Sequence, residues 1–227
     1  MRAEEGAATQ SAAAAHASNT WRWPFIPEGH TLFLSQPDEK GALRSLSTVT
    51  AANHAQDART QVRVNVDGTG AANVATGVSV LDHLLVLLAA YASFDLALEV
   101  APGDAEEEVR AAGRALGEAL FAPLRTEGLR GHGSAVVPSA EALAHVALEV
   151  SGHPLVVSNV DLSEARLGGL ETDVVAEFLQ ELAEGAGLTL HVRLIEGRDT
   201  EHVLEAIFKA LGVALAQAGR PRTARKE

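Results

Sequence analysis

The stretch EEEVRAAGRALGEAL at residues 106–120 returns 95 positions later as EHVLEAIFKALGVAL at residues 201–215. Both stretches keep the order Leu-Gly-x-Ala-Leu and differ mainly at polar positions. Upstream the agreement continues at an offset of 94, where the apolar positions of 81–88 and 94–100 fall on those of 175–182 and 188–194. A helix, a strand and a helix therefore recur in one order, which indicates an ancient duplication. The alternative is chance similarity in a chain rich in Ala and Leu.

The spacing of apolar residues outside the repeat completes each half. Val62, Val64 and Val66 alternate with polar neighbours, which is typical of a half-buried strand. From Val78 onward the spacing is that of a helix. Each half supplies strands, a helix, a strand and a helix, as expected for helices packed on one face of a sheet. The pattern predicts strands over 60–66, 72–76, 94–100, 135–138, 144–150, 155–158 and 188–194, and helices over 78–91, 106–120, 172–184 and 200–218.

These elements divide the chain into four parts. We expect an N-terminal extension at 1–56, a first half-domain at 57–134, a second half-domain at 135–219 and a basic tail at 220–227. The extension begins with an Ala/Ser-rich stretch of about 20 residues, which we expect to be disordered because it offers little apolar surface to bury.

Composition excludes several classes of function. The formal net charge of −12 and the pI near 5.2 disfavour a nucleic-acid groove or an anionic membrane surface as a partner, because both need a concentrated basic patch. The chain has no Cys, which excludes disulfides, thiolate zinc sites and a cysteine nucleophile. His and carboxylates remain as strong metal ligands. The N-terminus does not resemble a signal peptide, and no apolar run would span a bilayer, so we expect a cytoplasmic protein.

The final helix carries the clearest polar constellation. Glu201, His202, Glu205 and Lys209 lie off its apolar stripe at helical spacing, so they are neighbours. A His and carboxylates in this arrangement could hold a divalent cation, and His191 on the preceding strand could add a ligand. Spacing alone favours the plainer interpretation, an ordinary solvated helix face.

A set of short motifs changes that weighting. The motifs are Asp67-Gly-Thr-Gly70, Thr76-Gly77, Leu81-Asp82-His83-Leu-Leu85, Phe94-Asp-Leu96, Leu116-Gly-Glu-Ala-Leu120, Pro138 with Glu141-Ala-Leu143, Ser151-Gly152 with Pro154, Thr189-Leu-His-Val192, and His202-Val-Leu-Glu205-Ala-Ile-Phe-Lys209-Ala. In order and spacing they resemble the imidazoleglycerol-phosphate dehydratase family of histidine biosynthesis, over a range from about Asp57 to Ala218. The resemblance implies an α+β fold made of a duplicated half-domain, each half a roughly four-stranded sheet backed by two helices.

The resemblance also implies a chemistry. Members of this family hold two manganese ions per active site with His and Glu at subunit interfaces, and these ions activate an imidazole ring for loss of water. The ligand pattern is His-His-x-x-Glu on the second helix of each half, together with an Asp-His and a Leu-His motif. By this match, His83, His191 and Glu205 are the candidate catalytic residues. The candidate metal ligands are His83, His191, Glu201, His202 and Glu205.

The first half departs from that pattern. Glu106 and Glu107 stand where the family has two histidines, and Arg110 stands where it has the Glu. A guanidinium cannot ligate a cation, and its fixed charge opposes metal binding nearby. We therefore expect Arg110 to form a structural salt bridge with Glu106, Glu107 or a carboxylate of the facing subunit. The alternative is residual binding of Mn²⁺ or Mg²⁺ at reduced stoichiometry through the remaining carboxylates.

The phosphate-binding motifs of the family are also incomplete. Lys209 matches a lysine that contacts substrate phosphate, but one family arginine falls on Gly131, with Arg130 beside it, and another falls on His153. The family's C-terminal phosphate loop is replaced by the basic tail. Lys209 and Arg130 are thus the candidate substrate-binding residues.

Two functions of different class follow. The first is a dehydratase-like protein whose activity is lost or weakened and whose role is structural or regulatory, a pseudoenzyme. The second is an active metal-dependent carbon–oxygen lyase that removes water from imidazoleglycerol phosphate, a small phosphorylated imidazole. A one-metal enzyme acting on another substrate is a weaker third interpretation. In either of the first two cases the resemblance implies self-association into a trimer or a larger homo-oligomer.

Overall fold

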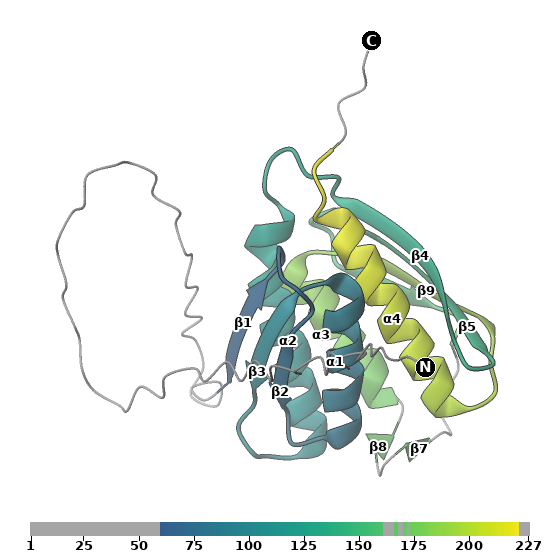
Figure 1. The fold of residues 1–227 in the computed structure, drawn as a ribbon. Helices are drawn as coiled ribbons and strands as arrows, with labels where there is room; N and C mark the ends of the chain where they lie inside the picture. The colour runs from purple at the N-terminus through teal and green to yellow at the C-terminus, as the bar shows by residue number, and fades with distance from the viewer. Residues whose placement is uncertain (1–59, 161–165, 168–169, 172, 223–227) are drawn as a thin grey trace, which may run out of the picture. The chain divides into compact units, whose positions relative to one another are not determined.

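The computed structural model describes residues 60–160, 166–167, 170–171 and 173–222 (Figure 1). They belong to one compact unit that spans Ser47–Glu227. The expected N-terminal extension lies outside the described residues.

The described elements follow the predicted order closely. The first half contains β1 (Gln61–Asn65), β2 (Ala72–Ala75), α1 (Ser79–Ala92), β3 (Asp95–Glu99) and α2 (Ala105–Leu124). The second half contains β4 (His132–Ser139), β5 (Ala142–Glu149), β6 (Leu155–Ser158), α3 (Asp173–Ala186), β9 (Thr189–Glu196) and α4 (Thr200–Ala218). A short hairpin of β7 (Arg166–Leu167) and β8 (Leu170–Glu171) was not predicted. The expected boundary between the half-domains at 134/135 falls inside β4.

The element boundaries reproduce the repeat found in the sequence. Helices α1 and α3 have 14 residues each, and their first residues are 94 positions apart, from 79 to 173. Helices α2 and α4 begin 95 positions apart, at 105 and 200. Helix α4 begins at Thr200 as predicted, with Asp199 as its cap, whereas α3 continues two residues past the expected end to Ala186, where Gly187 follows with a left-handed φ of 66°.

The two sheets share one topology. In the first half the strand order is β1-β3-β2, with β1 antiparallel and β2 parallel to β3. In the second half the order is β4-β5-β9-β6, with β5 antiparallel and β6 parallel to β9. Strands β1, β3 and β2 therefore correspond to β5, β9 and β6. The expected four strands are present in the second half, whereas the first half has three within its described part.

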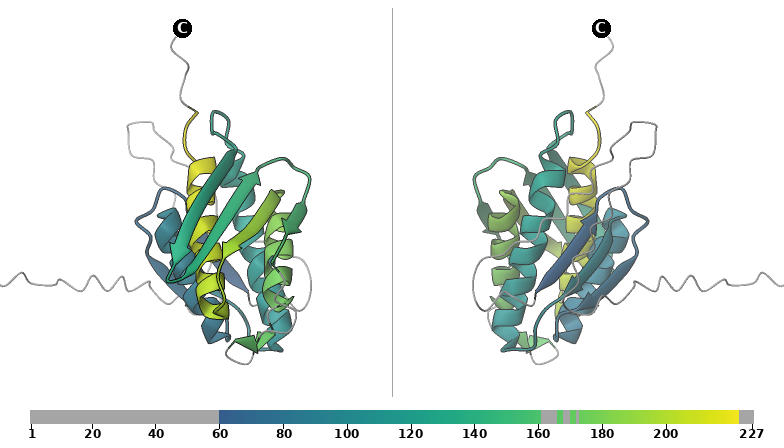
Figure 2. Two further views of the ribbon diagram at one scale, coloured as in Figure 1. Left: turned by 90° about the vertical axis from the view of Figure 1, so that its right-hand side faces the viewer. Right: turned by 90° about the vertical axis from the view of Figure 1, so that its left-hand side faces the viewer.

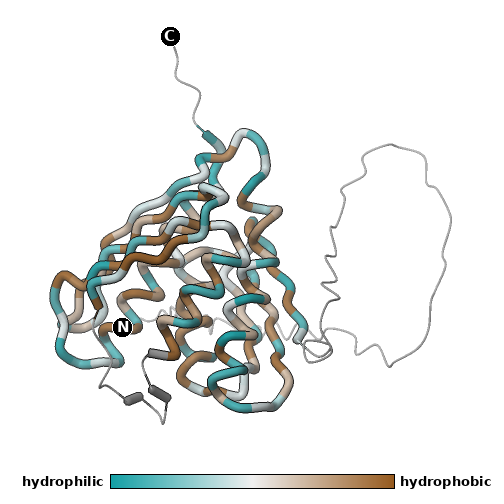
Figure 3. Tube along the Cα trace, turned by 180° about the vertical axis from the view of Figure 1, so that it is seen from behind, coloured by the Kyte–Doolittle hydropathy of each residue, from teal (hydrophilic) through white to brown (hydrophobic). Residues whose placement is uncertain are grey.

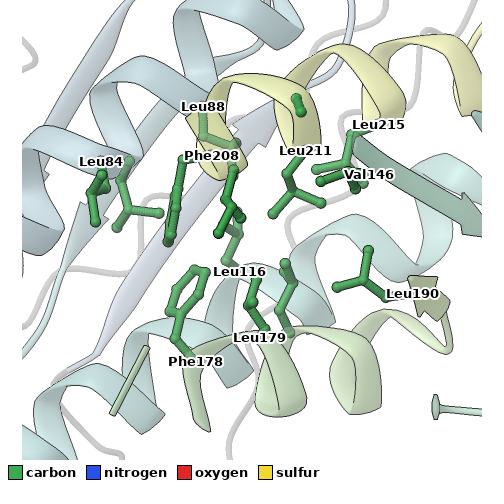
Figure 4. Close-up of a cluster of buried hydrophobic side chains, with 14 of the residues drawn as sticks. Leu84, Leu88, Leu116, Val146, Phe178, Leu179, Leu190, Phe208, Leu211 and Leu215 are labelled. Carbon is green, nitrogen blue, oxygen red and sulfur yellow. The ribbon is translucent and has the colours of Figure 1, made fainter. Parts of the chain in front are cut away.

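The helices lie between the two sheets, so each sheet has one covered face (Figure 2). Contacts between the halves are made helix to helix, with α2 packed on α3 and α1 packed on α4. Hydrophobic positions recur along these helices and strands (Figure 3), and a close-up shows their side chains converging, with Leu116 near the stacked rings of Phe178 and Phe208 (Figure 4). Burial of this continuous apolar layer is the main stabilising term of the fold.

Two glycines permit the close approach of the helix pairs. A Cβ on Gly117 of α2 would lie 2.6 Å from the carbonyl oxygen of Leu182 in α3. A Cβ on Gly212 of α4 would lie 2.4 Å from the carbonyl oxygen of Leu88 in α1. Residues 117 and 212 are 95 apart, and 88 and 182 are 94 apart, so one contact occurs in two copies. The Leu-Gly-x-Ala-Leu repeat is thus a helix-packing motif.

Within the described ranges, no helix has the length and apolar character needed to cross a bilayer.

Candidate functional site

The contact between α1 and α4 carries a polar cluster centred on Glu205. His83 of α1 places Nε2 2.9 Å from Glu205 Oε1. Ser139, at the end of β4, donates its hydroxyl to Glu205 Oε2 at 2.5 Å, and Lys209 Nζ donates to the same oxygen at 2.8 Å. Lys209 also donates to Ser139 Oγ at 2.8 Å, and its Nζ lies 6.0 Å from the centre of the Tyr91 ring. We call His83, Ser139, Glu205 and Lys209 the Glu205 cluster.

The environment of Glu205 keeps its carboxylate ionised. Its side chain is 18% exposed, yet three donors surround it. The hydrogen bond from Lys209, followed by those from Ser139 and His83, lowers the pKa of Glu205 from 4.5 to about 2. Lys209 is itself held close by helical spacing, one turn after Glu205. The cluster therefore presents a charge-balanced, hydrogen-bonded carboxylate at neutral pH.

A second pair lies one turn earlier on α4. His202 Nδ1 is 2.6 Å from Glu141 Oε2, in the turn between β4 and β5. The other oxygen of Glu141 accepts the backbone N–H groups of Asp199 at 3.0 Å and Arg198 at 3.3 Å. The Asp199 bond is the main reason that the pKa of Glu141 falls to about 2, and Glu141 in turn raises the pKa of His202 above 6.5. Glu141 thus fixes the His202 ring against the start of α4.

The contact between α2 and α3 carries a different set of charges. Arg110 pairs with Glu106 one turn before it on α2, and its Nε lies 2.8 Å from Glu177 Oε2 on α3. One turn later, Arg114 donates to the two carboxylate oxygens of Glu181 at 2.9 and 3.1 Å. The contact with Glu177, followed by the charge of Glu106, raises the pKa of Arg110 above its ordinary value. The predicted pairing of Arg110 with Glu106 is confirmed, and its second carboxylate comes from its own chain.

The repeat relates these two sets directly. Position 83 plus 94 is 177, and position 110 plus 95 is 205. The His83–Glu205 pair and the Glu177–Arg110 pair are therefore the same contact in the two copies. The acidic residue lies on the second helix of the second half, α4, in one contact and on the first helix of that half, α3, in the other. One contact offers an imidazole and a carboxylate, and the other a carboxylate and a guanidinium.

The remaining candidate residues lie apart from these clusters within one chain. His191 is exposed on β9 while its neighbours Leu190 and Val192 are buried, as the alternation predicts, so it lies on the sheet face that the helices do not cover. Glu201 is exposed in the first turn of α4, where its N–H donates to Asp199. Arg130 precedes β4 near the other end of α4, where Gly131 N–H donates to Ala218. Nine residues of helix, about 13 Å, separate that end from Lys209.

Three contributing residues were missed by the sequence reasoning. Ser139 and Glu141 flank Ala140, whose φ of 48° makes the tight turn between β4 and β5. Glu141 belongs to a quoted motif, but no spacing rule joins it to His202, 61 positions away. Glu177 could have been found from the repeat, because it occupies the position equivalent to His83. Only the sheet-to-helix packing reveals the roles of Ser139 and Glu141.

The donor set fits the expected metal only in part. His83 and Glu205 are donors of the kind that Mn²⁺ binds, and His202 lies one turn away. The Arg110 guanidinium, in contrast, occupies the equivalent place in the other half, where it donates to Glu106 and forms an ion pair with Glu177. Among the described residues of one chain, no three His, Asp or Glu side chains converge in a metal-holding group. The first-half set does not fit a cation, and the second-half set would need ligands from a neighbouring chain.

Comparison with known proteins adds independent findings. Residues 76–215 match the family model described as imidazoleglycerol-phosphate dehydratase. Relatives of that name include one from Acetivibrio thermocellus, 43% identical over 162 residues that cover 69% of this chain and 83% of the relative. Another, from Syntrophobacter fumaroxidans, is 45% identical over 162 residues, covering 69% and 82%.

Solved structures of the same name agree in fold. The structure from Staphylococcus aureus has a TM-score of 0.68 and 31% sequence identity, covering 74% of this chain and 96% of that one. The structure from Pyrococcus furiosus has a TM-score of 0.64 and 29% identity, covering 72% and 90%.

Proposed function

The chain belongs to the imidazoleglycerol-phosphate dehydratase family of histidine biosynthesis, and we propose that its own dehydratase activity is lost or strongly weakened. In this proposal the chain keeps the scaffold of the family and serves a structural or regulatory role. The finding that supports it most directly is the position of Arg110. Elimination of water depends on both an activated ring and a positioned substrate, and the chain departs from the family at both.

Arg110 is the main support for the proposal, because it forms ion pairs at a position where the family resemblance implies a metal ligand. The family resemblance places a ligating Glu there, whereas Arg110 bridges Glu106 of α2 and Glu177 of α3. Two of the carboxylates at this place, Glu106 and Glu177, are engaged by the guanidinium. A divalent cation would have to displace a permanently charged group that already pairs with them. In this proposal, side-chain ion pairs take the place of a metal at the α2–α3 contact.

The second half supports an alternative, an active metal-dependent dehydratase with Mn²⁺ at reduced stoichiometry. The supporting observation is the Glu205 cluster, which keeps an ionised carboxylate beside His83 and Lys209. His83, Glu205, His202 and Glu201 would hold the ion together with His191 of an adjoining chain. Bound manganese would supply a Lewis acid that polarises the imidazole ring.

In that alternative, the chain's own residues have defined tasks. Lys209 and Arg130 would bind the substrate phosphate. His83, His191 and Glu205 would be catalytic residues. Glu141 would hold the His202 ring in place through the 2.6 Å bond to Nδ1, which leaves Nε2 as the ring's other polar atom.

Assembly and location complete the proposal. We propose a homo-oligomer, trimeric or larger, because His191 and the Glu205 cluster lie on different faces of one chain and can meet only between chains. We also propose that the two half-domains, expected at 57–134 and 135–219, are the inherited units, with all of β4 in the second of them, and that the protein works in the cytoplasm. Nucleic acids and membranes are not proposed partners, given the net charge of −12.

The decisive experiment combines metal analysis with turnover. Full-length protein purified without chelators is dialysed against Mn²⁺, its metal content per subunit is measured, and dehydration of imidazoleglycerol phosphate is assayed. We expect less than one tightly held ion per subunit and turnover at least about 10³-fold below that of an intact family member. Two ions per subunit together with turnover comparable to that member would overturn the proposal.

A ligand-restoring variant sharpens the result. Glu106→His, Glu107→His and Arg110→Glu together recreate the family pattern, and we expect this triple variant to bind more Mn²⁺ than the parent chain. Glu118→His, an exposed position on the same helix, controls for an added histidine. Equal metal content in the parent and the triple variant would contradict the role given to Arg110.

A further inference from the structure

Ser139 is a buried polar residue at the end of β4, on the side of the strand that packs on α4. Gly133, Ala135 and Val137 precede it on that side, and none of them carries a polar side chain. Gly133 approaches α4 so closely that an added Cβ would lie 1.9 Å from the carbonyl oxygen of Ala214. Ser139 is only 7% exposed. A hydroxyl in such a place needs hydrogen-bond partners, because its loss of water is otherwise uncompensated.

The partners of Ser139 are two charged side chains of α4. Its hydroxyl donates to Glu205 Oε2 at 2.5 Å and accepts from Lys209 Nζ at 2.8 Å. Lys209 Nζ also donates to Glu205 Oε2 at 2.8 Å, so the three groups form a closed ring of hydrogen bonds. An ammonium group has three N–H donors, and two of them are used in this ring. Because Ser139 belongs to β4, the ring ties the Glu205 carboxylate to the sheet as well as to its own helix.

The two oxygens of Glu205 lie in different surroundings. Oε2 faces Ser139 and Lys209, whose side chain is only 13% exposed. Oε1 lies 2.9 Å from Nε2 of His83, whose side chain is 51% exposed. A cation that arrives from solvent therefore meets Oε1 and the imidazole, while Oε2 is occupied on the buried side. Without the ring of hydrogen bonds the carboxylate could rotate, and hydrogen bonds of this kind fix the orientation of metal-ligating carboxylates.

We propose that Ser139 is a positioning residue, which fixes the Glu205 carboxylate so that Oε1, beside His83, is the oxygen presented to a divalent cation. Ser139 does not contact the cation itself. Lys209 lies on the same helix as Glu205 and has a long, flexible side chain, so it orients the carboxylate less firmly than a short hydroxyl held by the sheet. The inference rests on the alternative under the proposed function, in which the second half holds Mn²⁺, and it adds a residue that the sequence match did not include.

The test measures Mn²⁺ affinity on the full-length protein, with no assay of turnover. Mn²⁺ is titrated at neutral pH, and the free ion is measured by electron paramagnetic resonance. We expect saturable binding to the parent chain that is absent in Glu205→Gln, which identifies the site. Ser139→Ala should weaken this binding about tenfold or more, as expected when a hydrogen bond to a metal-ligating carboxylate is lost. Ser139→Thr keeps the hydroxyl, so its affinity should lie closer to that of the parent.

Ser134→Ala is the matched control, because Ser134 is the other serine of β4 and its hydroxyl lies 2.8 Å from Nε2 of His145. It should leave the Mn²⁺ affinity unchanged, and urea unfolding verifies that each variant is folded. The inference is overturned by equal affinities in Ser139→Ala and the parent, by equal losses in Ser134→Ala and Ser139→Ala, or by no saturable binding in the parent. That last outcome leaves the proposed loss of activity standing, whereas turnover with two ions per subunit overturns only the loss of activity.

Discussion

The two halves of this molecule use one helix-packing scheme and opposite charge arrangements. At the α1–α4 contact, a carboxylate on the second helix accepts hydrogen bonds from His83, Ser139 and Lys209. At the α2–α3 contact, the equivalent helix position carries Arg110, which reaches a carboxylate on the first helix of the other half. Gly117 and Gly212 occupy equivalent positions and are shared by the two copies, whereas Gly113 of α2 stands where α4 carries Phe208.

This comparison shows that the packing and the polar chemistry of a duplicated unit can diverge separately. Close helix approach depends on the absence of a side chain at Gly117 and Gly212, so it tolerates any polar pair at the helix margin that balances charge. Arg110 with Glu177 satisfies that condition, and at the α1–α4 contact Lys209 supplies the positive charge beside Glu205. The α2–α3 contact contains an ion pair, whereas the α1–α4 contact keeps a carboxylate and an imidazole, which are groups that can bind a cation.

The largest effects are expected where the two copies agree. Gly117→Ala and Gly212→Ala should each destabilise the fold by about 2–3 kcal/mol, because the new Cβ would overlap a backbone carbonyl oxygen of the facing helix. Gly219→Ala is the control, since its nearest neighbour would be an ordinary 3.6 Å away. Urea unfolding measures all three, and equal stabilities would show that the shared packing scheme is misassigned.

A smaller effect on the free energy of unfolding is expected at the polar pairs beside the two helix contacts. Arg114 and Lys209 are equivalent positions, since 114 plus 95 is 209. Arg114→Met should cost about 1–2 kcal/mol, because it removes both hydrogen bonds to Glu181, which is only 19% exposed. Lys209→Met should cost less, because Glu205 keeps its bonds to Ser139 and His83. If urea unfolding finds the reverse order, the Glu205 cluster is the tighter contact.

The pH dependence of stability isolates Glu205. Its folded pKa of about 2 lies below its ordinary value of 4.5, so its contribution is fully present above pH 4.5 and is lost as pH falls toward 2. The stability advantage of the parent chain over Glu205→Gln should therefore shrink as pH falls from 5 to about 2.5. Urea midpoints at a series of pH values measure it, and an advantage that is independent of pH would contradict the assignment.

The smallest expected effect is the shift in the pKa of His202. Glu141 raises the pKa of His202, so this pair stabilises the fold below pH 6.5 and the contribution is lost as pH rises through the raised folded pKa. NMR titration of the ring should show a pKa above 6.5 that falls in Glu141→Gln and changes little in Glu201→Gln. If the pKa of His202 is unchanged in Glu141→Gln, Glu141 does not interact with the His202 ring as described.

Much of the fold could be predicted from the sequence because it depends on local periodicity. The 94- and 95-residue offsets of the repeat recur in the helix boundaries, and strand β6 and helix α4 end where predicted. Errors lie at the ends of elements and in the short β7–β8 hairpin, which was not predicted. Helix α2 continues past 120 to Leu124 with Pro123 in its last turn, and β4 begins at His132, three residues before the expected strand.

The candidate site was harder to predict from the sequence, because its contacts join segments that are far apart along the chain. Helical spacing predicts that Lys209 lies beside Glu205, but not that Ser139 donates to both of them. The repeat implies that Arg110 and Glu205 are equivalent, yet Glu177 becomes its partner only because α2 packs on α3. Arg222 was expected in a basic tail, and the hydrogen bonds that pair that segment with Gly128 and Arg130 were not predicted.

The sequence by itself determined the duplicated α+β plan and the family, because both depend on residue order and on periods of two and 3.6 residues. It also determined that position 110 carries a cation where position 205 carries an anion. Tertiary structure alone decided which charges meet, since helices from different halves pack together and bring residues 67 to 122 positions apart within hydrogen-bond distance. Side-chain pairing across a helix contact depends on distance in space, which a linear pattern does not encode.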